Sequence, residues 1–243
     1  MGGGVKMSIL LNLRIVDNEV VDYSGMSSGL TISQYNTSQP INFSNSIFAN
    51  HQCFDFGLYS RLCISNIVLR FSNDFTIAYW IKSKIENRWN TSTYNSGAND
   101  GDWCVFMGVP FYSTLYMQGA ISYEKYNNGD IGSSIGIARG KCNDTNWHHL
   151  AMCRKEGTVN VYIDGVKKLS TSNSNDLYIN TSTSQIIQVG GCDWNRNYGF
   201  DGYMDDIVIA DHCIFDNDFT IPKTYLLSPI YNLYTTNNIY GIL

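Results

Sequence analysis

Charged residues are scarce in this chain: only 15% of its 243 residues are Asp, Glu, Lys or Arg, and the net charge at pH 7 is −5. A nucleic-acid-binding surface needs concentrated Lys and Arg, and the sequence has no such basic stripe. It also lacks an apolar run of about 20 residues, the length that crosses a bilayer. Asn12 and Arg14 interrupt the apolar stretch Ser8–Val16, so it lacks the apolar core of a signal peptide. We therefore expect no nucleic-acid partner, no membrane partner and no signal peptide.

Cysteine spacing argues against a zinc site. The seven cysteines form no CxxC pair, which is the spacing typical of structural zinc sites, and their number is odd. We expect free thiols that fill small core positions in a protein that folds in a reducing compartment. The cysteines are Cys53, Cys63, Cys104, Cys142, Cys153, Cys192 and Cys213.

Alternation of apolar and polar residues dominates the chain, and helical periodicity is almost absent. In Phe75–Lys82 the odd-numbered residues are all large and apolar, which predicts a strand with one buried face. Two tight turns, Glu156-Gly157 and Asp164-Gly165, predict hairpins. Such short strands in one chain of this length predict an all-β fold, a two-sheet antiparallel β-sandwich of the jelly-roll type. The predicted strands are 9–15, 53–56, 62–65, 75–82, 103–109, 115–123, 134–139, 147–155, 158–163, 166–169, 184–189 and 203–210.

The chain divides into three parts on this pattern. Residues 1–7 form a leader or a disordered start, because three glycines precede Met7 and Met7 is the hypothesised natural start. Residues 8–222 form the sandwich, with Ser27–Asn45 expected to be a loop holding at most one strand. Residues 223–243 form an apolar tail with a single charged side chain, Lys223. We expect the tail either to pack on its own sandwich or to attach to a neighbouring subunit.

Several segments resemble, in order, the motifs of laminin-G-like jelly rolls. Phe75–Ile81 resembles the family's FTI-x-x-W strand, and Trp147–Ala151 resembles its WHH-hydrophobic-A strand. Val161–Gly165 resembles the YVDG turn, and Phe200–Ile207 resembles the closing F-x-G-x-I-D-D strand. Val21–Gly25 resembles an early D-x-SG turn. The chain is therefore similar, over residues 8–222, to concanavalin A-like lectin and glucanase domains, and this resemblance implies a lectin-like, glycan-binding role.

A second resemblance concerns the exit from the last strand. Asn217–Lys223 is similar to the NFT-x-P segment of laminin-G-like domains in bacteriophage tail-fibre and head proteins. It implies a virion structural protein, either a capsid-decorating, head-fibre or tail-fibre subunit, made in the host cytoplasm. Its expected partners are other virion proteins, further copies of itself and a host-surface or environmental glycan. The alternative is a free-standing, calcium-dependent carbohydrate-binding module, and a third reading is a glycoside hydrolase.

Catalysis is not expected. Retaining glycosidases use two carboxylates about 5 Å apart, which jelly-roll glucanases supply from a Glu-x-Asp-x-x-Glu strand. The chain has four glutamates, and none has an Asp two positions later. They are Glu19, Glu86, Glu124 and Glu156.

Calcium is the one cofactor that the sequence leaves open. Asp205 alternates with Tyr203, Ile207 and Ile209, so we expect it to share their face and to be a buried carboxylate. Such a group needs hydrogen-bond partners or a cation. Backbone hydrogen bonds are the simpler expectation, and a calcium ligand is the functional one. The other candidate calcium ligands are Asp100, Asp102, Asn143 and Asp144.

Aromatic residues in polar loops are the candidates for sugar binding, because a flat ring can stack on the apolar face of a pyranose. Four fit this description: Trp89, Trp103, Trp194 and Tyr198. Trp80 and Trp147 lie on strands of the family pattern and are expected to be structural. His148 and His149 are neighbours on one strand, so they point to opposite faces and cannot share a metal ion.

Overall fold

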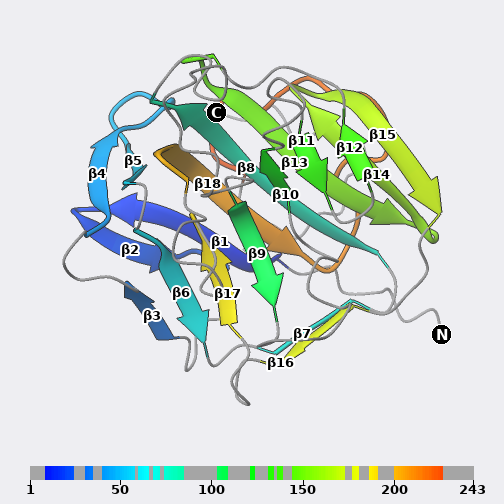
Figure 1. Ribbon diagram of the computed structural model, residues 1–243, viewed down its shortest axis with the longest axis horizontal. Helices are drawn as coiled ribbons and strands as arrows, with labels where there is room; N and C mark the ends of the chain where they lie inside the picture. Colours follow the sequence, from blue (N-terminus) through cyan, green and yellow to red (C-terminus); the bar gives the residue numbers. More distant parts are fainter. Residues whose placement is uncertain are drawn as a thin grey trace, which may run out of the picture.

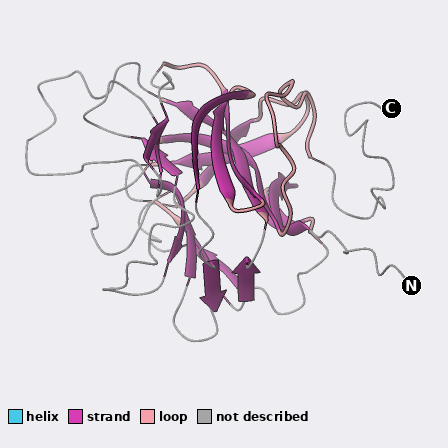
Figure 2. Cartoon of the chain, turned by 90° about the vertical axis from the view of Figure 1, so that its right-hand side faces the viewer, coloured by secondary structure: helices cyan, strands magenta, loops and turns pink. Residues whose placement is uncertain are grey.

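The protein is built from strands and turns. The computed structural model describes residues 9–24, 31–34, 40–57, 60–65, 68–71, 74–84, 103–108, 121–123, 131–133, 136–138, 144–172, 177–180, 186–190 and 200–226. Figure 2 shows strands and loops in this part and no helix, so nothing described there could span a membrane as a helix. The all-β, antiparallel two-sheet prediction is confirmed.

The larger sheet has nine antiparallel strands. Its centre is β8 (Phe75–Ser83), which pairs with β13 (His148–Lys155) on one side and with β18 (Gly202–Ala210) on the other. β1 (Ile9–Val16) and β5 (Gln52–Phe56) both pair with β18, toward its opposite ends. In spatial order the strands are β15 (Val166–Ser172), β14 (Thr158–Ile163), β13 (His148–Lys155), β8 (Phe75–Ser83), β18 (Gly202–Ala210), β1 (Ile9–Val16), β5 (Gln52–Phe56) and β4 (Asn42–Asn45), with β2 (Glu19–Asp22) beside β1.

The second sheet has seven antiparallel strands and packs on the first. Figure 1 looks onto both sheets, with β9 and β17 drawn over the strands of the larger one. In spatial order its strands are β12 (Gly136–Ala138), β11 (Ile131–Ser133), β10 (Ile121–Tyr123), β9 (Trp103–Gly108), β17 (Ile186–Val189), β6 (Leu62–Ser65) and β3 (Thr31–Gln34). A separate pair joins β7 (Val68–Phe71) to β16 (Leu177–Asn180).

The main core lies between the two sheets. The apolar face of β8 supplies Ile77, Tyr79 and Ile81, all fully buried, and β17 and β6 supply Ile187 and Ile64 from the other side. This is the face that the alternation in Phe75–Lys82 predicted. Burial of large apolar side chains on this scale is the main source of stability in such a sandwich.

A second core covers the outer face of the larger sheet. Ala78, Cys153 and Tyr162 point outward from β8, β13 and β14 and are buried. What buries them is residues 211–226, which we call the cover segment. Its Phe215 and Phe219 rings stack with centroids 3.9 Å apart, and both pack edge-on against the buried His149 ring. The cover segment therefore shields one end of the larger sheet's outer face from solvent.

Two edge strands and one turn in the first 45 residues were not fully predicted from the sequence. β3 and β4 both lie within Ser27–Asn45, where at most one strand was expected. Each has four residues, none of them buried, and lies at the edge of its sheet, so neither shows a buried alternate face. Asp17 and Asn18, with φ of 51° and 63°, form a tight turn between β1 and β2 that was also missed.

The described residues place the first part of the tail. Leu226 is 5% exposed and belongs to the second core, and the Tyr225 ring packs on Phe48 with centroids 4.6 Å apart. The contacts of the sandwich therefore extend past residue 222 to Leu226. The predicted leader, 1–7, and residues 227–243 lie outside the described part.

Candidate functional site

Aromatic and charged side chains form a row across the uncovered end of the larger sheet's outer face. We call Trp147, Lys82, Tyr203 and Asp55 the aromatic row. Lys82 pairs with Tyr203 across β8 and β18, and Tyr203 pairs with Asp55 across β18 and β5. Trp147 precedes the His148–Ile81 pair, which brings it beside Lys82. The Trp147 and Tyr203 rings lie 6.3 Å apart with a 49° tilt, and all four residues are partly exposed.

Lys84 holds the Asp55 end of the row in place. Its ammonium lies 2.5 Å from Asp55 and 3.4 Å from Asp201, and it donates to the carbonyl of Phe56 at 2.8 Å. Burial lowers the pKa of Lys84, but the two carboxylates outweigh burial and raise the pKa above its usual value. Both lysines approach the Tyr203 ring, Lys82 at 5.8 Å and Lys84 at 5.4 Å from its centroid. The ring is therefore held in one orientation.

The row combines the two kinds of group that a sugar needs. Two partly exposed aromatic rings that lie beside each other offer apolar surface to a sugar ring. Lys82 and Asp55 offer a hydrogen-bond donor and acceptors beside the rings. Sequence reasoning missed this arrangement because it treated Trp147 as structural. The outward face of the Phe75–Lys82 strand, which carries Lys82, was the signal that could have indicated it.

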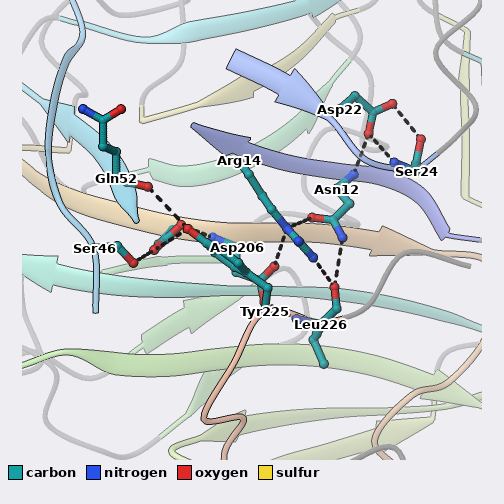
Figure 3. Close-up of polar contacts among 10 residues, drawn as sticks. Asn12, Arg14, Asp22, Ser24, Ser46, Gln52, Asp206, Tyr225 and Leu226 are labelled. Atoms are coloured by element: carbon teal, nitrogen blue, oxygen red, sulfur yellow. Dashed lines mark hydrogen bonds and ion pairs between the residues drawn. The ribbon is translucent and has the colours of Figure 1, made fainter. Parts of the chain in front are cut away.

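A buried acidic pair lies on the same outer face, beneath the end of the cover segment (Figure 3). Asp205 and Asp206 are 0% and 1% exposed. Asp205 accepts hydrogen bonds from the Ser46 hydroxyl and, at 2.8 Å, from the backbone N–H of Asp206. Asp206 accepts the N–H of Leu226 at 2.8 Å. The pair thus joins β18 to the loop after β4 and to the cover segment.

Arg14 and Asn12 complete this cluster from β1. The guanidinium of Arg14 lies 3.7 Å from Asp206 and 4.3 Å from the centroid of the Tyr225 ring. Arg14 and Asn12 both donate to the carbonyl oxygen of Leu226. Figure 3 shows Arg14 and Asn12 meeting at this carbonyl. Both backbone polar groups of Leu226 are therefore satisfied by the sheet, which fixes the cover segment at this point.

Burial raises the pKa of both acids. It raises the pKa of Asp205 to about 6, against the hydrogen bond from Ser46, and that of Asp206 to about 7, against the hydrogen bond from Leu226. The closing D-D motif is explained by this arrangement, because both carboxyl groups act inside the fold. The early D-x-SG turn is explained similarly, since Asp22 accepts the backbone N–H groups of Asn12 at 2.9 Å and of Ser24 at 3.0 Å.

The expected facing of Asp205 was wrong, although its burial was predicted correctly. A bulge interrupts the β18–β8 pairing between Asp205 and Val208, and Asp206 has a φ of 45°. The extra residue reverses the alternation, so Ile207 and Ile209 face the inter-sheet core. Asp205 pairs with Trp80, which packs on the outer face against His149. Alternation read through a bulge assigns every later side chain to the wrong face.

Replacing Asp206 with asparagine is expected to change the pH dependence of stability. In the folded protein the pKa of Asp206 is raised from 3.8 to about 7. Its contribution to the free energy of unfolding is therefore fully present below pH 4 and is lost as the pH rises through 7. Asn cannot ionise but still accepts the Leu226 N–H. The stability of Asp206→Asn relative to the wild type should therefore increase by roughly 2–4 kcal/mol between pH 4 and pH 8 in urea unfolding. Asp216→Asn, at the exposed ion pair with Lys155, is the control, and a difference for Asp206→Asn that does not vary with pH would contradict the assignment.

The two histidines have separate structural roles. His149 is 1% exposed, and burial lowers its pKa to about 3, so it is neutral in the second core. His148 lies between Asp164, 2.8 Å from Nδ1, and Asp144, 2.9 Å from Nε2. Burial lowers the pKa of His148, but the two carboxylates outweigh it and raise the pKa. The Asp164 carboxylate also accepts the N–H of His149 at 2.9 Å, which links the W-H-H strand to the I-D-G turn.

The structure places only part of the predicted site. The side chains of Trp89, Trp103, Trp194, Tyr198, Asp100, Asp102 and Asn143 lie outside the described residues. Of the remaining calcium candidates, Asp144 is paired with His148, and the Asp205 oxygens accept hydrogen bonds from protein groups. No group of three or more His, Cys, Asp or Glu in the described ranges could hold a metal ion.

A comparison with protein-family models assigns most of the chain to one family. The model described as the concanavalin A-like lectin/glucanases superfamily matches residues 56–218. This range contains the aromatic residues of the row, the His148 cluster and both buried acids. No curated protein matches the chain.

Solved structures with low sequence identity share the fold. Domain 4 of AbnA, an extracellular arabinanase from Geobacillus stearothermophilus solved in complex with arabinotriose, has a TM-score of 0.58 at 19% identity, covering 86% of this chain and 94% of that one. The binding domain of Paraclostridial Mosquitocidal Protein 1 has a TM-score of 0.57 at 16% identity, covering 85% of this chain and 49% of that one. At such identities the likeness establishes the fold alone.

Proposed function

Because this chain belongs to the concanavalin A-like lectin/glucanases superfamily, we propose that it binds a glycan through the aromatic row and catalyses no reaction. The domain is of the lectin-like, carbohydrate-binding type. The observation that carries the proposal is the partly exposed pair of rings, Trp147 and Tyr203, beside the polar groups of Lys82 and Asp55. The arabinotriose complex of AbnA domain 4 supports a saccharide as the ligand class.

A glycan array with the labelled full chain tests the proposal, followed by calorimetric titration of the best ligand. Binding to at least one saccharide class is expected. We also expect EDTA to leave the affinity unchanged, because the described calcium candidates Asp144 and Asp205 are occupied by protein partners. Loss of binding in EDTA, restored by calcium, would favour the calcium-dependent module instead.

The absence of catalysis is part of the proposal. The adjacent acids Asp205 and Asp206 are buried under Tyr225 and Leu226, so they are inaccessible to a glycosidic bond. Asp55 and Asp201 are accessible, but both are paired with the charged Lys84. A glycosidase of the retaining type needs one carboxyl group that stays protonated to act as the acid. Release of reducing sugar from the bound glycan would contradict this part of the proposal.

We propose a virion as the setting: a capsid-decorating, head-fibre or tail-fibre subunit made in the host cytoplasm, with virion proteins and further copies of itself as partners. The support is the similarity of Asn217–Lys223 to bacteriophage proteins and the apolar sequence after Leu226. Its abundance in purified particles, measured by quantitative mass spectrometry, tests this setting independently of glycan binding.

Truncation after Leu226 is expected to leave the domain folded but to abolish its attachment to particles or oligomers. The reason is that residues up to Leu226 make the contacts of the sandwich, whereas 227–243 carry apolar residues that suit docking. Truncation after Lys223 is the matched control, and it should lower the melting temperature because Asp206, Arg14 and Asn12 lose Leu226. Unfolding of the chain that ends at Leu226 would show that the remaining residues belong to the core.

A further inference from the structure

Two cysteines meet where the cover segment crosses the larger sheet. Cys153 points outward from β13 and is fully buried, whereas Cys213 lies in the cover segment and is partly exposed. Both belong to the second core, and both are free thiols. The hydrophobic segment around Cys213 therefore lies directly on the strand that carries Cys153.

One hydroxyl group fixes the backbone on both sides of Cys213. Thr76 of β8 donates to the carbonyl of His212 at 2.8 Å and accepts the N–H of Ile214 at 2.8 Å. The same oxygen lies 3.4 Å from the sulfur of Cys153. Thr76 and Cys153 also face each other in the β8–β13 pairing. The backbone on both sides of Cys213 is thus fixed by the same Thr76 hydroxyl that contacts the sulfur of Cys153.

We propose that Cys153 and Cys213 are a disulfide-forming pair, which on oxidation ties the cover segment covalently to β13. The sulfur of Cys153 lies 3.4 Å from the Thr76 hydroxyl, and the sulfur of Cys213 lies 3.3 Å from the carbonyl oxygen of Phe215, which packs in the same second core. Burial raises the pKa of Cys153, but the neighbouring Cys213 thiol, the Thr76 hydroxyl and backbone groups together outweigh burial and lower it, which favours Cys153 as the attacking thiolate in the second step. Cys153 and burial in turn raise the pKa of Cys213.

The cover segment gains from such a bond because its underside is incompletely hydrogen-bonded. The hydroxyl of Tyr162 and the side-chain carbonyl of Asn160 are buried on the outer face of β14 and have no partner among the described residues. Asn160 pairs with Cys153 across the two strands. Burying these polar groups without partners costs free energy and weakens the attachment of the cover segment. A covalent bond at this position would hold the segment in place despite that cost.

The oxidant is a low-molecular-weight disulfide such as oxidised glutathione. Because Cys153 is fully buried, the partly exposed Cys213 reacts first. Its thiol loses its proton to solvent, against a raised pKa, and the thiolate attacks one glutathione sulfur, releases one glutathione thiolate and leaves a mixed disulfide on Cys213. The thiolate of Cys153 then attacks the Cys213 sulfur and releases the second glutathione thiolate. Two cysteine thiols are oxidised to one disulfide, and one glutathione disulfide is reduced to two thiols, which take up the two protons.

Oxidation of the full chain with oxidised glutathione, followed by non-reducing peptide mapping, tests the proposal. The expected product is a peptide joining Cys153 to Cys213, with a melting temperature about 5–15 °C above that of the reduced protein and reversal by dithiothreitol. Cys213→Ser should lose both the cross-link and the rise, whereas Cys63→Ser, in β6, should keep both. The non-reducing peptide map of the wild-type protein tests the proposal even if a variant fails to fold. Separate alkylation of Cys153 and Cys213 after oxidation, or a bond from either to another cysteine, would overturn the proposal.

Discussion

Replacing Gly165 with alanine is expected to destabilise the protein by roughly 2–5 kcal/mol. Gly165 has a φ of +77°, which L residues rarely adopt, and a Cβ there would lie 2.0 Å from the carbonyl oxygen of Phe219. Neither group can move freely, because the N–H of Phe219 donates to the Gly165 carbonyl at 2.9 Å and Asp218 accepts the N–H of Lys167 at 2.8 Å. The substitution therefore pushes the cover segment away from the β14–β15 turn. Urea unfolding measures the loss.

Gly57→Ala is the matched control for this substitution. A Cβ on Gly57 would meet only the Ser60 hydroxyl at 3.8 Å, an ordinary van der Waals distance. Its stability should lie within about 1 kcal/mol of the wild type. If Gly165→Ala were no more destabilising than Gly57→Ala, the cover segment could not be packed on the turn as described.

Tyr203→Ala and Trp147→Ala are each expected to weaken glycan binding at least about tenfold, a loss of about 1.4 kcal/mol or more. Each variant removes one of the two rings of the aromatic row, which lie 6.3 Å apart. Tyr203→Phe keeps the ring and should retain most of the affinity. Titration calorimetry with the best ligand from the array measures these differences, after each variant is shown to melt as the wild type does.

Tyr23→Ala is the control for loss of aromatic surface elsewhere. Tyr23 is 38% exposed, and the Arg14 guanidinium lies over its ring, 4.9 Å from the centroid. Tyr23 is not among the residues whose cross-strand pairing aligns the row. Its removal should leave the affinity unchanged. Equal losses for Tyr23→Ala and Tyr203→Ala would show that the binding does not depend on the row.

The fold was predictable because its central strands carry strong local signals. Phe75–Lys82 places large apolar residues on one face, and the Asp164-Gly165 turn has positive φ at both residues, as a tight hairpin requires. The short edge strands β3 and β4 were not predictable in this way. Neither strand contains a buried residue, so neither carries the buried apolar residues that mark the central strands. The pairing partner of β3, β6, also lies about 30 residues further along the chain.

The candidate site was less predictable, because cross-strand neighbours come from distant parts of the chain. Trp147, Lys82 and Tyr203 belong to three strands, and only the register brings them together. The bulge at Asp206 is also absent from the alternation, since Ile207 and Ile209 look like neighbours of Asp205 in sequence. What the sequence indicated correctly is that Asp205 would be buried and would need partners.

A crystal structure of the full chain with its tightest-binding glycan tests the central claim most directly. We expect a sugar ring to lie against Trp147 and Tyr203, with Lys82 or Asp55 within hydrogen-bond distance of its hydroxyl groups. A saccharide bound on the seven-stranded sheet, or anywhere away from these residues, would contradict the account.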